Sequence, residues 1–275
     1  MFAVLMLCPV AASQAQLAWQ PAMHAATSHA GHGKHEGHGK KAVSGHRGPK
    51  RFQLTGQLES TVDISLIRPD LTTVEMPNNG DNVTVRPSGM GNYHALVARQ
   101  SAAGREDVAV RYLYMNGKTS GNSPSDLLAQ PLSRLQLIPA PLPREHRRYL
   151  TRKPYQFEVR FDGELMPEQP VTLRTQGGSQ QDLLADKRGI LTVVFPEDFE
   201  EIHKGRRKNR PGDWQLSTYI RMDDVLYRTS LSAPYSPSPA NWQSYSLGAL
   251  VAALGFGVGL VANRRVPEQS RRKKR

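Results

Sequence analysis

Cysteine is almost absent from this sequence: the chain has one, Cys8, in an apolar run near its start. Residues 2–15 (FAVLMLCPVAASQA) have the apolar core and small-residue end of a secretory signal, with cleavage expected after Ala15. No positive residue precedes the apolar core, which leaves open either a start further upstream or a weak signal. Removal of residues 1–15 leaves no thiol, which excludes disulfides, cysteine metal ligands and cysteine nucleophiles.

Acidic residues are also few, with 24 Asp and Glu against 36 Lys and Arg, and the formal net charge is +12. The excess lies at the two ends of the chain. Residues 264–275 carry +6 and residues 1–51 carry +5, which leaves +1 for residues 52–263. A nucleic-acid-binding domain normally carries a basic stripe across its folded surface. We therefore expect no nucleic-acid partner.

Catalytic motifs are missing as well. The sequence has no hydrolytic triad signature, no His-Glu-x-x-His pair and no phosphate-cradling glycine loop between a strand and a helix. The glycine-rich stretch GFGVG lies inside an apolar segment near the C-terminus instead. We therefore predict a protein that is not an enzyme and has no organic cofactor.

Long amphipathic helices are scarce, and alternating strand patterns take their place. Residues 51–67 alternate apolar and polar side chains, as half-buried strands do. Similar short runs lie at residues 82–89, 92–99, 106–117, 132–141, 155–163, 169–178, 188–196, 213–224 and 225–235. Turn sequences such as NNGD, MNGK, FDGE and TQGGS separate them. We predict a mainly β fold of sandwich type, with short helical turns only at residues 125–132 and 196–205.

The domain boundaries follow changes in composition. Residues 139–148 are rich in proline and charge, so we predict a first sandwich unit at residues 51–143 and a second at residues 144–235. Residues 236–245 contain further prolines and are predicted to form a stiff spacer.

The second apolar segment, residues 246–262, carries no charge and predicts a single transmembrane helix. Aromatic residues precede it, and a basic tail at residues 263–275 follows it, which places the C-terminus in the cytoplasm and the bulk of the chain outside, in the periplasm. Small residues four apart within the segment would let a partner helix approach closely. The predicted anchor residues are Trp242, Tyr245, Gly255, Gly259, Arg264 and Arg265.

Residues 16–50 have few large apolar side chains, and we predict a disordered arm. Histidines recur along it, and neutral imidazole is a good ligand for nickel, cobalt, copper and zinc. The predicted metal ligands are His24, His29, His32, His35, His38 and His46. Such an arm must be ordered on binding, so we expect a weak collector of ions rather than a selective site. The alternative is a polar linker with incidental metal affinity.

Four stretches carry a resemblance to a known family. They are YLYMNGKTSGNSPSDLLAQPLSRLQLIPAPLP, YQFEVRFDGELMPEQPVTLRTQGG, LLADKRGILTVVFPEDF and RPGDWQLSTYIR. Their order is similar to the extracytoplasmic nickel-uptake, substrate-specific transmembrane-region family, over about residues 52–262. The resemblance implies immunoglobulin-like or carboxypeptidase-regulatory-like β-sandwiches that end in one membrane helix. The matching motif residues are structural: Asp162, Gly163, Gly189, Pro211, Gly212 and Trp214.

These observations predict a membrane-anchored accessory protein for transition-metal uptake or handling, with nickel or cobalt implied by the resemblance. A metal permease would be the partner of the membrane helix. The competing hypothesis is a non-catalytic cell-envelope sandwich that contacts other proteins, with the histidine segment as a linker.

Overall fold

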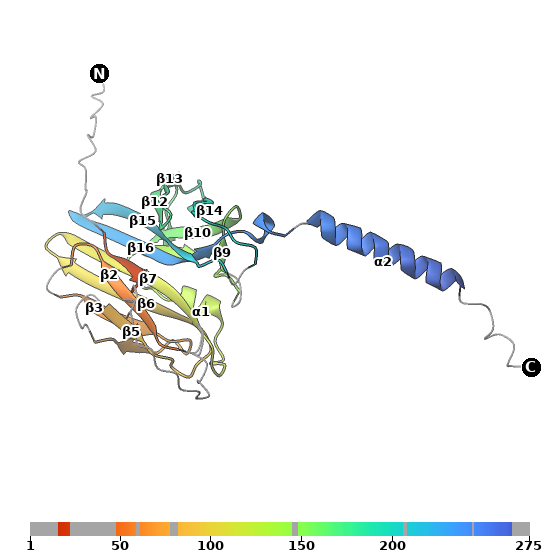
Figure 1. Ribbon diagram of the computed structural model, residues 1–275. Coiled ribbons are helices and arrows are strands. Elements are labelled where there is room, and N and C mark those ends of the chain that lie inside the picture. The colour runs from red at the N-terminus through yellow and green to blue at the C-terminus, as the bar shows by residue number, and fades with distance from the viewer. Residues whose placement is uncertain are drawn as a thin grey trace, which may run out of the picture.

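Strands are the main secondary structure of the described residues, and Figure 1 shows them stacked in layers from which one long helix projects. The computed structural model describes residues 16–22, 48–58, 61–77, 82–144, 148–205, 208–243 and 245–265. The strands are β1 (Ala18–Pro21), β2 (Lys50–Thr55), β3 (Asp63–Ile67), β4 (Thr73–Glu75), β5 (Asn82–Val85), β6 (Asn92–Ala102), β7 (Arg105–Met115), β8 (Leu135–Pro139), β9 (Tyr149–Leu150), β10 (Pro154–Phe161), β11 (Glu164–Leu165), β12 (Pro170–Thr175), β13 (Gln180–Leu184), β14 (Ile190–Val194), β15 (Gly212–Met222) and β16 (Val225–Ser236). The helices are α1 (Pro124–Leu128), the 3-10 turn η1 (Pro239–Asn241) and α2 (Tyr245–Arg265).

The strands form one large sheet and two small ones. The large sheet has the order β13-β12-β15-β16-β7-β6-β3-β4, with β9 attached to β16. A three-stranded sheet, β1-β2-β5, contributes to one hydrophobic cluster on it, and the sheet formed by β8, β10, β11 and β14 contributes to another. The predicted mainly β, sandwich-like fold is therefore confirmed.

The strands β6 and β7 are buried on both of their faces. Ala95 and Val97 belong to the cluster shared with β10 and β14, whereas Leu96 and Ala98 belong to the cluster shared with β1, β2 and β5. A strand covered on both sides reads as a continuous apolar run rather than an alternating one. The sequences NYHALVA and VAVRYLYM in these strands have that character. Three layers, not two, therefore meet at the middle of the large sheet.

The large sheet crosses the predicted boundary between residues 143 and 144. Its strand β16 comes from the second predicted unit and pairs in parallel with β7 of the first, from Leu226 opposite Arg105 to Ser232 opposite Arg111. The prediction of two separate sandwich units is corrected accordingly. Pairing between strands more than a hundred residues apart leaves no local pattern in the sequence, so composition alone suggested a seam there.

The predicted arm also requires a correction, because its first residues are part of the fold. Strand β1 pairs antiparallel with β2, and the side chains of Leu17 and Trp19 are buried. The Trp19 indole donates a hydrogen bond from Nε1 to the carbonyl oxygen of Ala109, at 3.1 Å. Residues 16–21 are thus ordered, whereas residues 23–47 lie outside the described part of the chain.

The predicted spacer is likewise partly built into the sandwich. Strand β16 runs to Ser236, whose carbonyl oxygen accepts a hydrogen bond from the Thr151 amide at 3.1 Å. The Ser238 amide donates to the Thr151 hydroxyl at 2.9 Å. The predicted turn at residues 125–132 is present as α1, but residues 196–205 are not helical.

Helix α2 covers the predicted membrane segment and extends away from the strands in Figure 1. Its side chains are described from Gly248 to Val261, and all are exposed. Within the residues that the structure describes, no helix has both the length and the apolarity needed to cross a membrane.

Candidate functional site

The six histidines of the predicted metal site (His24, His29, His32, His35, His38 and His46) all lie in residues 23–47, outside the described chain. Both ends of that segment are placed. The Ala22 amide donates to the carbonyl oxygen of Arg51 at 3.1 Å, and Pro21 lies opposite Phe52 in the β1–β2 register. The segment is therefore the connection of a β-hairpin. In the described residues, no three His, Cys, Asp or Glu side chains are grouped as a metal site.

The predicted anchor residues are distributed between η1 and α2. Trp242 is the C-cap residue of η1, and its side chain is half-buried. Gly255 and Gly259 lie on α2, with open space where a side chain would be. The side chains of Tyr245, Arg264 and Arg265 are outside the description.

A cavity of about 610 Å³ lies beside the place where the histidine segment leaves and re-enters the fold. It opens where the large sheet forks. The parallel pairing of β7 with β16 ends at Arg111 opposite Ser232, and further along β16 pairs with β9 instead, with Tyr235 opposite Tyr149. Ala22 and Pro49 both line the cavity. The six predicted ligands are thus carried by a connection whose two ends meet at this cavity.

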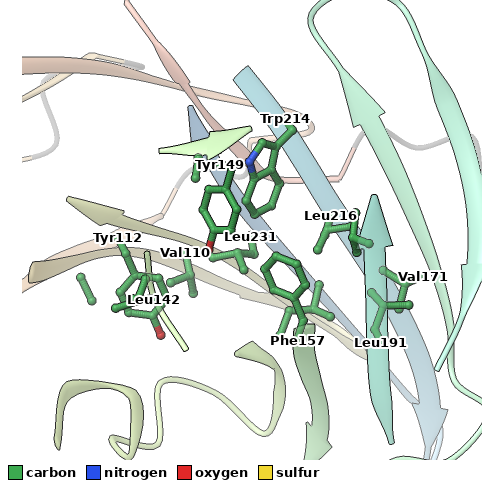
Figure 2. Packing of buried hydrophobic residues seen from close by; sticks show 14 of the residues in the cluster. Val110, Tyr112, Leu142, Tyr149, Phe157, Val171, Leu191, Trp214, Leu216 and Leu231 are labelled. Atoms are coloured by element: carbon green, nitrogen blue, oxygen red, sulfur yellow. The ribbon is translucent and has the colours of Figure 1, made fainter. Parts of the chain in front are cut away.

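Aromatic side chains form much of the cavity wall. Tyr112 comes from β7, Tyr149 from β9 and Trp214 from β15. Figure 2 shows the Trp214 nitrogen directed toward the Tyr149 ring, and the two rings are perpendicular with centroids 5.0 Å apart. Burial raises the pKa of the Tyr112 and Tyr149 hydroxyls above the usual range, so both remain neutral hydrogen-bond donors.

Cations dominate the charged groups of the cavity. Of the residues that the structure describes, four cationic ones line the cavity, against the single carboxylate of Asp213. That carboxylate is already engaged by one of the four, Arg111, through hydrogen bonds of 2.7 and 3.1 Å. The Arg111 guanidinium is buried and lies over the Phe52 ring, 5.0 Å from its centroid. The remaining cations are Lys50, Arg51 and Arg148.

The Lys50 ammonium is the cation most altered by this environment. Burial, together with repulsion from Arg111 and Arg148, lowers the pKa of Lys50 from 10.5 to about 8. Its Nζ atom donates one hydrogen bond, to the carbonyl oxygen of Tyr114 at 2.7 Å. An ammonium has three hydrogens to donate, so further donors are left for another acceptor.

The lowered pKa of Lys50 has a consequence for stability that can be measured. Below pH 8 the ammonium is charged in the folded and unfolded states, and its burial opposes folding. Between about pH 8 and 10.5 the folded protein binds fewer protons than the unfolded one, so stability should rise with pH. Relative to Lys50→Met, we expect a gain of about 1–3 kcal/mol, at 1.36 kcal/mol per pKa unit and reduced for partial exposure. Urea unfolding of both proteins at pH 7.5, 9 and 10.5 measures it, and a difference that does not change with pH would refute it.

The histidine in strand β6, His94, has a structural role, as single histidines in strands usually do. The ring is fully buried, and its nitrogens lie 2.7 Å from the Ser88 hydroxyl and 3.2 Å from the carbonyl oxygen of Asn92. Burial lowers the pKa of His94 below its ordinary value. Both ring nitrogens are therefore occupied by the fold.

The sequence pattern predicted the histidines but not the cavity. One indication was present: Arg111 interrupts the apolar run VAVRYLYM, and arginine is rarely buried in a strand unless it is paired. Its partner, Asp213, lies 102 residues further along the chain. The arrangement presents cations and aromatic residues to a cavity, which suits the binding of a ligand.

The sequence matches no family model and no curated protein. Among solved structures, the chain is similar to a 1.5-MDa bacterial ice-binding adhesin, with 12% identity, coverage of 70% of this chain and 58% of that chain, and a TM-score of 0.25. It is also similar to a two-domain fibronectin type III segment of chicken tenascin (9% identity, 69% of this chain, 93% of that chain, TM-score 0.21). A third similarity is to fibronectin(III)-like modules of Clostridium thermocellum CbhA (9% identity, 73% of this chain, 90% of that chain, TM-score 0.23). The β-sandwich assignment rests on the strand pairing described above.

Proposed function

We propose that this protein is a non-catalytic accessory protein of the cell envelope that collects transition-metal ions on the histidine segment, residues 23–47. The observation that carries the proposal is the anchoring of both ends of this segment, Ala22 and Pro49, at one cavity of the sandwich. Tethering at both ends restricts the volume that the six imidazoles sample, which raises their effective concentration around one ion. Neutral imidazole binds nickel, cobalt, copper and zinc, and the resemblance favours nickel or cobalt.

The proposal includes attachment to a membrane through residues 246–262. It is supported by the apolar side chains of α2, which do not pack on the sandwich: Leu250, Leu254 and Phe256 are 58%, 61% and 78% exposed. Apolar side chains that the fold leaves uncovered mark an interaction surface. In this arrangement the basic tail would face the cytoplasm, and a permease helix would contact Gly255 and Gly259.

Calorimetric titration of the full chain with nickel chloride tests the metal function. A variant with glutamine at His24, His29, His32, His35, His38 and His46 should bind nickel about tenfold more weakly or worse, because the ligands are removed and the fold is unaffected. His203→Gln is the matched control, since His203 is exposed and lies outside the segment. Equal nickel affinity in the six-substitution variant and the original chain would refute the proposal.

A second candidate function, contact with another protein, is favoured by the edge strand β13. This strand ends the large sheet, and its Leu184 side chain is 61% exposed. Unpaired edge strands can accept a strand from a partner. The nickel titration separates the two functions. If the protein only contacts other proteins and the histidine segment is a linker, the six-glutamine variant should show no specific loss of nickel affinity.

A further inference from the structure

The cavity at the fork of the sheet has features that collecting metal ions does not require. A metal-binding segment needs no cationic cavity beside it, because cations repel a metal ion. Four cationic residues in the described part of the chain nevertheless line this cavity, and the one carboxylate among these lining residues is bound by Arg111. The electrostatic preference of the cavity is therefore for an anion.

The apolar lining limits what kind of anion fits. Tyr112, Tyr149 and Trp214 line the cavity together with Leu142. A volume of about 610 Å³ is far larger than an inorganic anion and lies within the usual range for organic ligands. The lining suits a ligand with a flat or branched apolar body.

Hydrogen-bond donors also belong to residues that line this space. Lys50, the first residue of β2, lines the cavity and donates one hydrogen bond to the Tyr114 carbonyl oxygen. The hydroxyls of Tyr112 and Tyr149 make no hydrogen bond with the described residues and stay protonated. An ammonium and two neutral phenols together can satisfy the several lone pairs of a carboxylate.

We propose that this cavity is a binding site for a small organic carboxylate whose apolar body packs against the aromatic wall and whose charge meets Lys50. The site is separate from the histidine segment in its chemistry, since it recognises an anion rather than a cation. The residues that flank that segment, Ala22 and Pro49, line the cavity.

The test compares three probes by calorimetry with the unaltered full chain: 3-phenylpropionate, 3-phenylpropionamide and acetate. We expect 3-phenylpropionate to bind about tenfold or more tightly than the amide, which lacks the charge, and than acetate, which lacks the body. Equal binding of the acid and the amide would overturn the proposal, as would equal binding of acetate, or no binding of any probe. This comparison does not depend on a variant that folds.

Two variants locate the site. Lys50→Met should remove the preference for the acid over the amide, whereas Lys187→Met, at an exposed turn between β13 and β14, should keep it. An unchanged preference in Lys50→Met would place recognition elsewhere and overturn the assignment. The variant with six glutamines in the histidine segment should bind 3-phenylpropionate as the original chain does. Failure of nickel binding and failure of carboxylate binding are therefore distinguishable.

Discussion

Replacing Asp107 by asparagine is expected to lower the free energy of unfolding by about 3–5 kcal/mol, because it leaves buried cations without their counter-ion. Asp107 is fully buried on β7 and accepts a hydrogen bond from Arg228 Nη2 at 2.6 Å. The nitrogen Nε of Arg105 lies 3.0 Å from the same carboxylate. From β6, the Gln100 side-chain amide donates to it at 3.0 Å. The three strands β6, β7 and β16 thus meet through one carboxylate.

Urea denaturation at pH 7 measures this loss. The control is Asp182→Asn, which changes the same groups on the exposed strand β13 and should alter stability by no more than about 0.5 kcal/mol. Similar losses of unfolding free energy in the two variants would contradict the prediction, because they would show that removing a buried carboxylate costs no more than removing an exposed one. The cluster also favours the parallel pairing of β7 with β16, because Arg228 lies opposite Asp107 in that register.

Replacing Trp19 by alanine is expected to cost about 3–5 kcal/mol, the usual range for removing a large buried aromatic side chain. The indole of Trp19 is 1% exposed, packs in the cluster under β2 and β5, and donates to the Ala109 carbonyl. The backbone carbonyl of Trp19 accepts a further bond from the Ser232 hydroxyl at 2.8 Å. This strand therefore fastens the three-stranded sheet to β7 and β16.

The Trp19→Ala loss is read from urea unfolding followed by circular dichroism, which does not depend on the removed chromophore. Leu184→Ala serves as the comparison, since the Leu184 side chain is 61% exposed and its removal should change stability by about 0.5 kcal/mol or less. If Trp19→Ala were as mild as Leu184→Ala, residues 16–21 would belong to the histidine segment rather than to the sandwich.

Most long strands were predictable from sequence because their apolar pattern is local. The predictions at residues 92–99, 106–117, 155–163 and 225–235 are confirmed as β6, β7, β10 and β16. The turn sequence FDGE is confirmed as well: Asp162 and Gly163 take φ values of 49° and 87°, as a tight hairpin turn requires.

The strands that escaped prediction are short or polar. Strand β1 has four residues and precedes a long polar stretch. Hydrophobicity averaged over neighbouring residues is therefore low there, despite Leu17 and Trp19. Strand β13 (QQDLL) is polar because it is an exposed edge, which removes the alternation that identifies a half-buried strand.

The cavity was beyond sequence reasoning for a different reason. Lys50, Arg111, Tyr149 and Asp213 come from four strands that are neighbours only because β16 joins β7 and then β9. The spacing of these residues along the sequence therefore gives no sign that they lie together. The histidine segment, by contrast, is continuous in sequence, so its composition alone predicted a metal function that the titration above is designed to test.

The bond between the Ser230 hydroxyl and the Leu17 carbonyl joins residues 213 positions apart. A ribosome makes Leu17 and Trp19 long before it makes β16. Strand β1 can therefore pair with β2 early, but the hydrogen bonds to Ser230 and Ser232 must wait for the last strand of the sandwich. Closing so large a loop is slow, and unpaired apolar strands can associate with other chains meanwhile. The final contacts of β1 thus form only after nearly the whole polypeptide exists, which lengthens the time during which the newly made chain can associate with others.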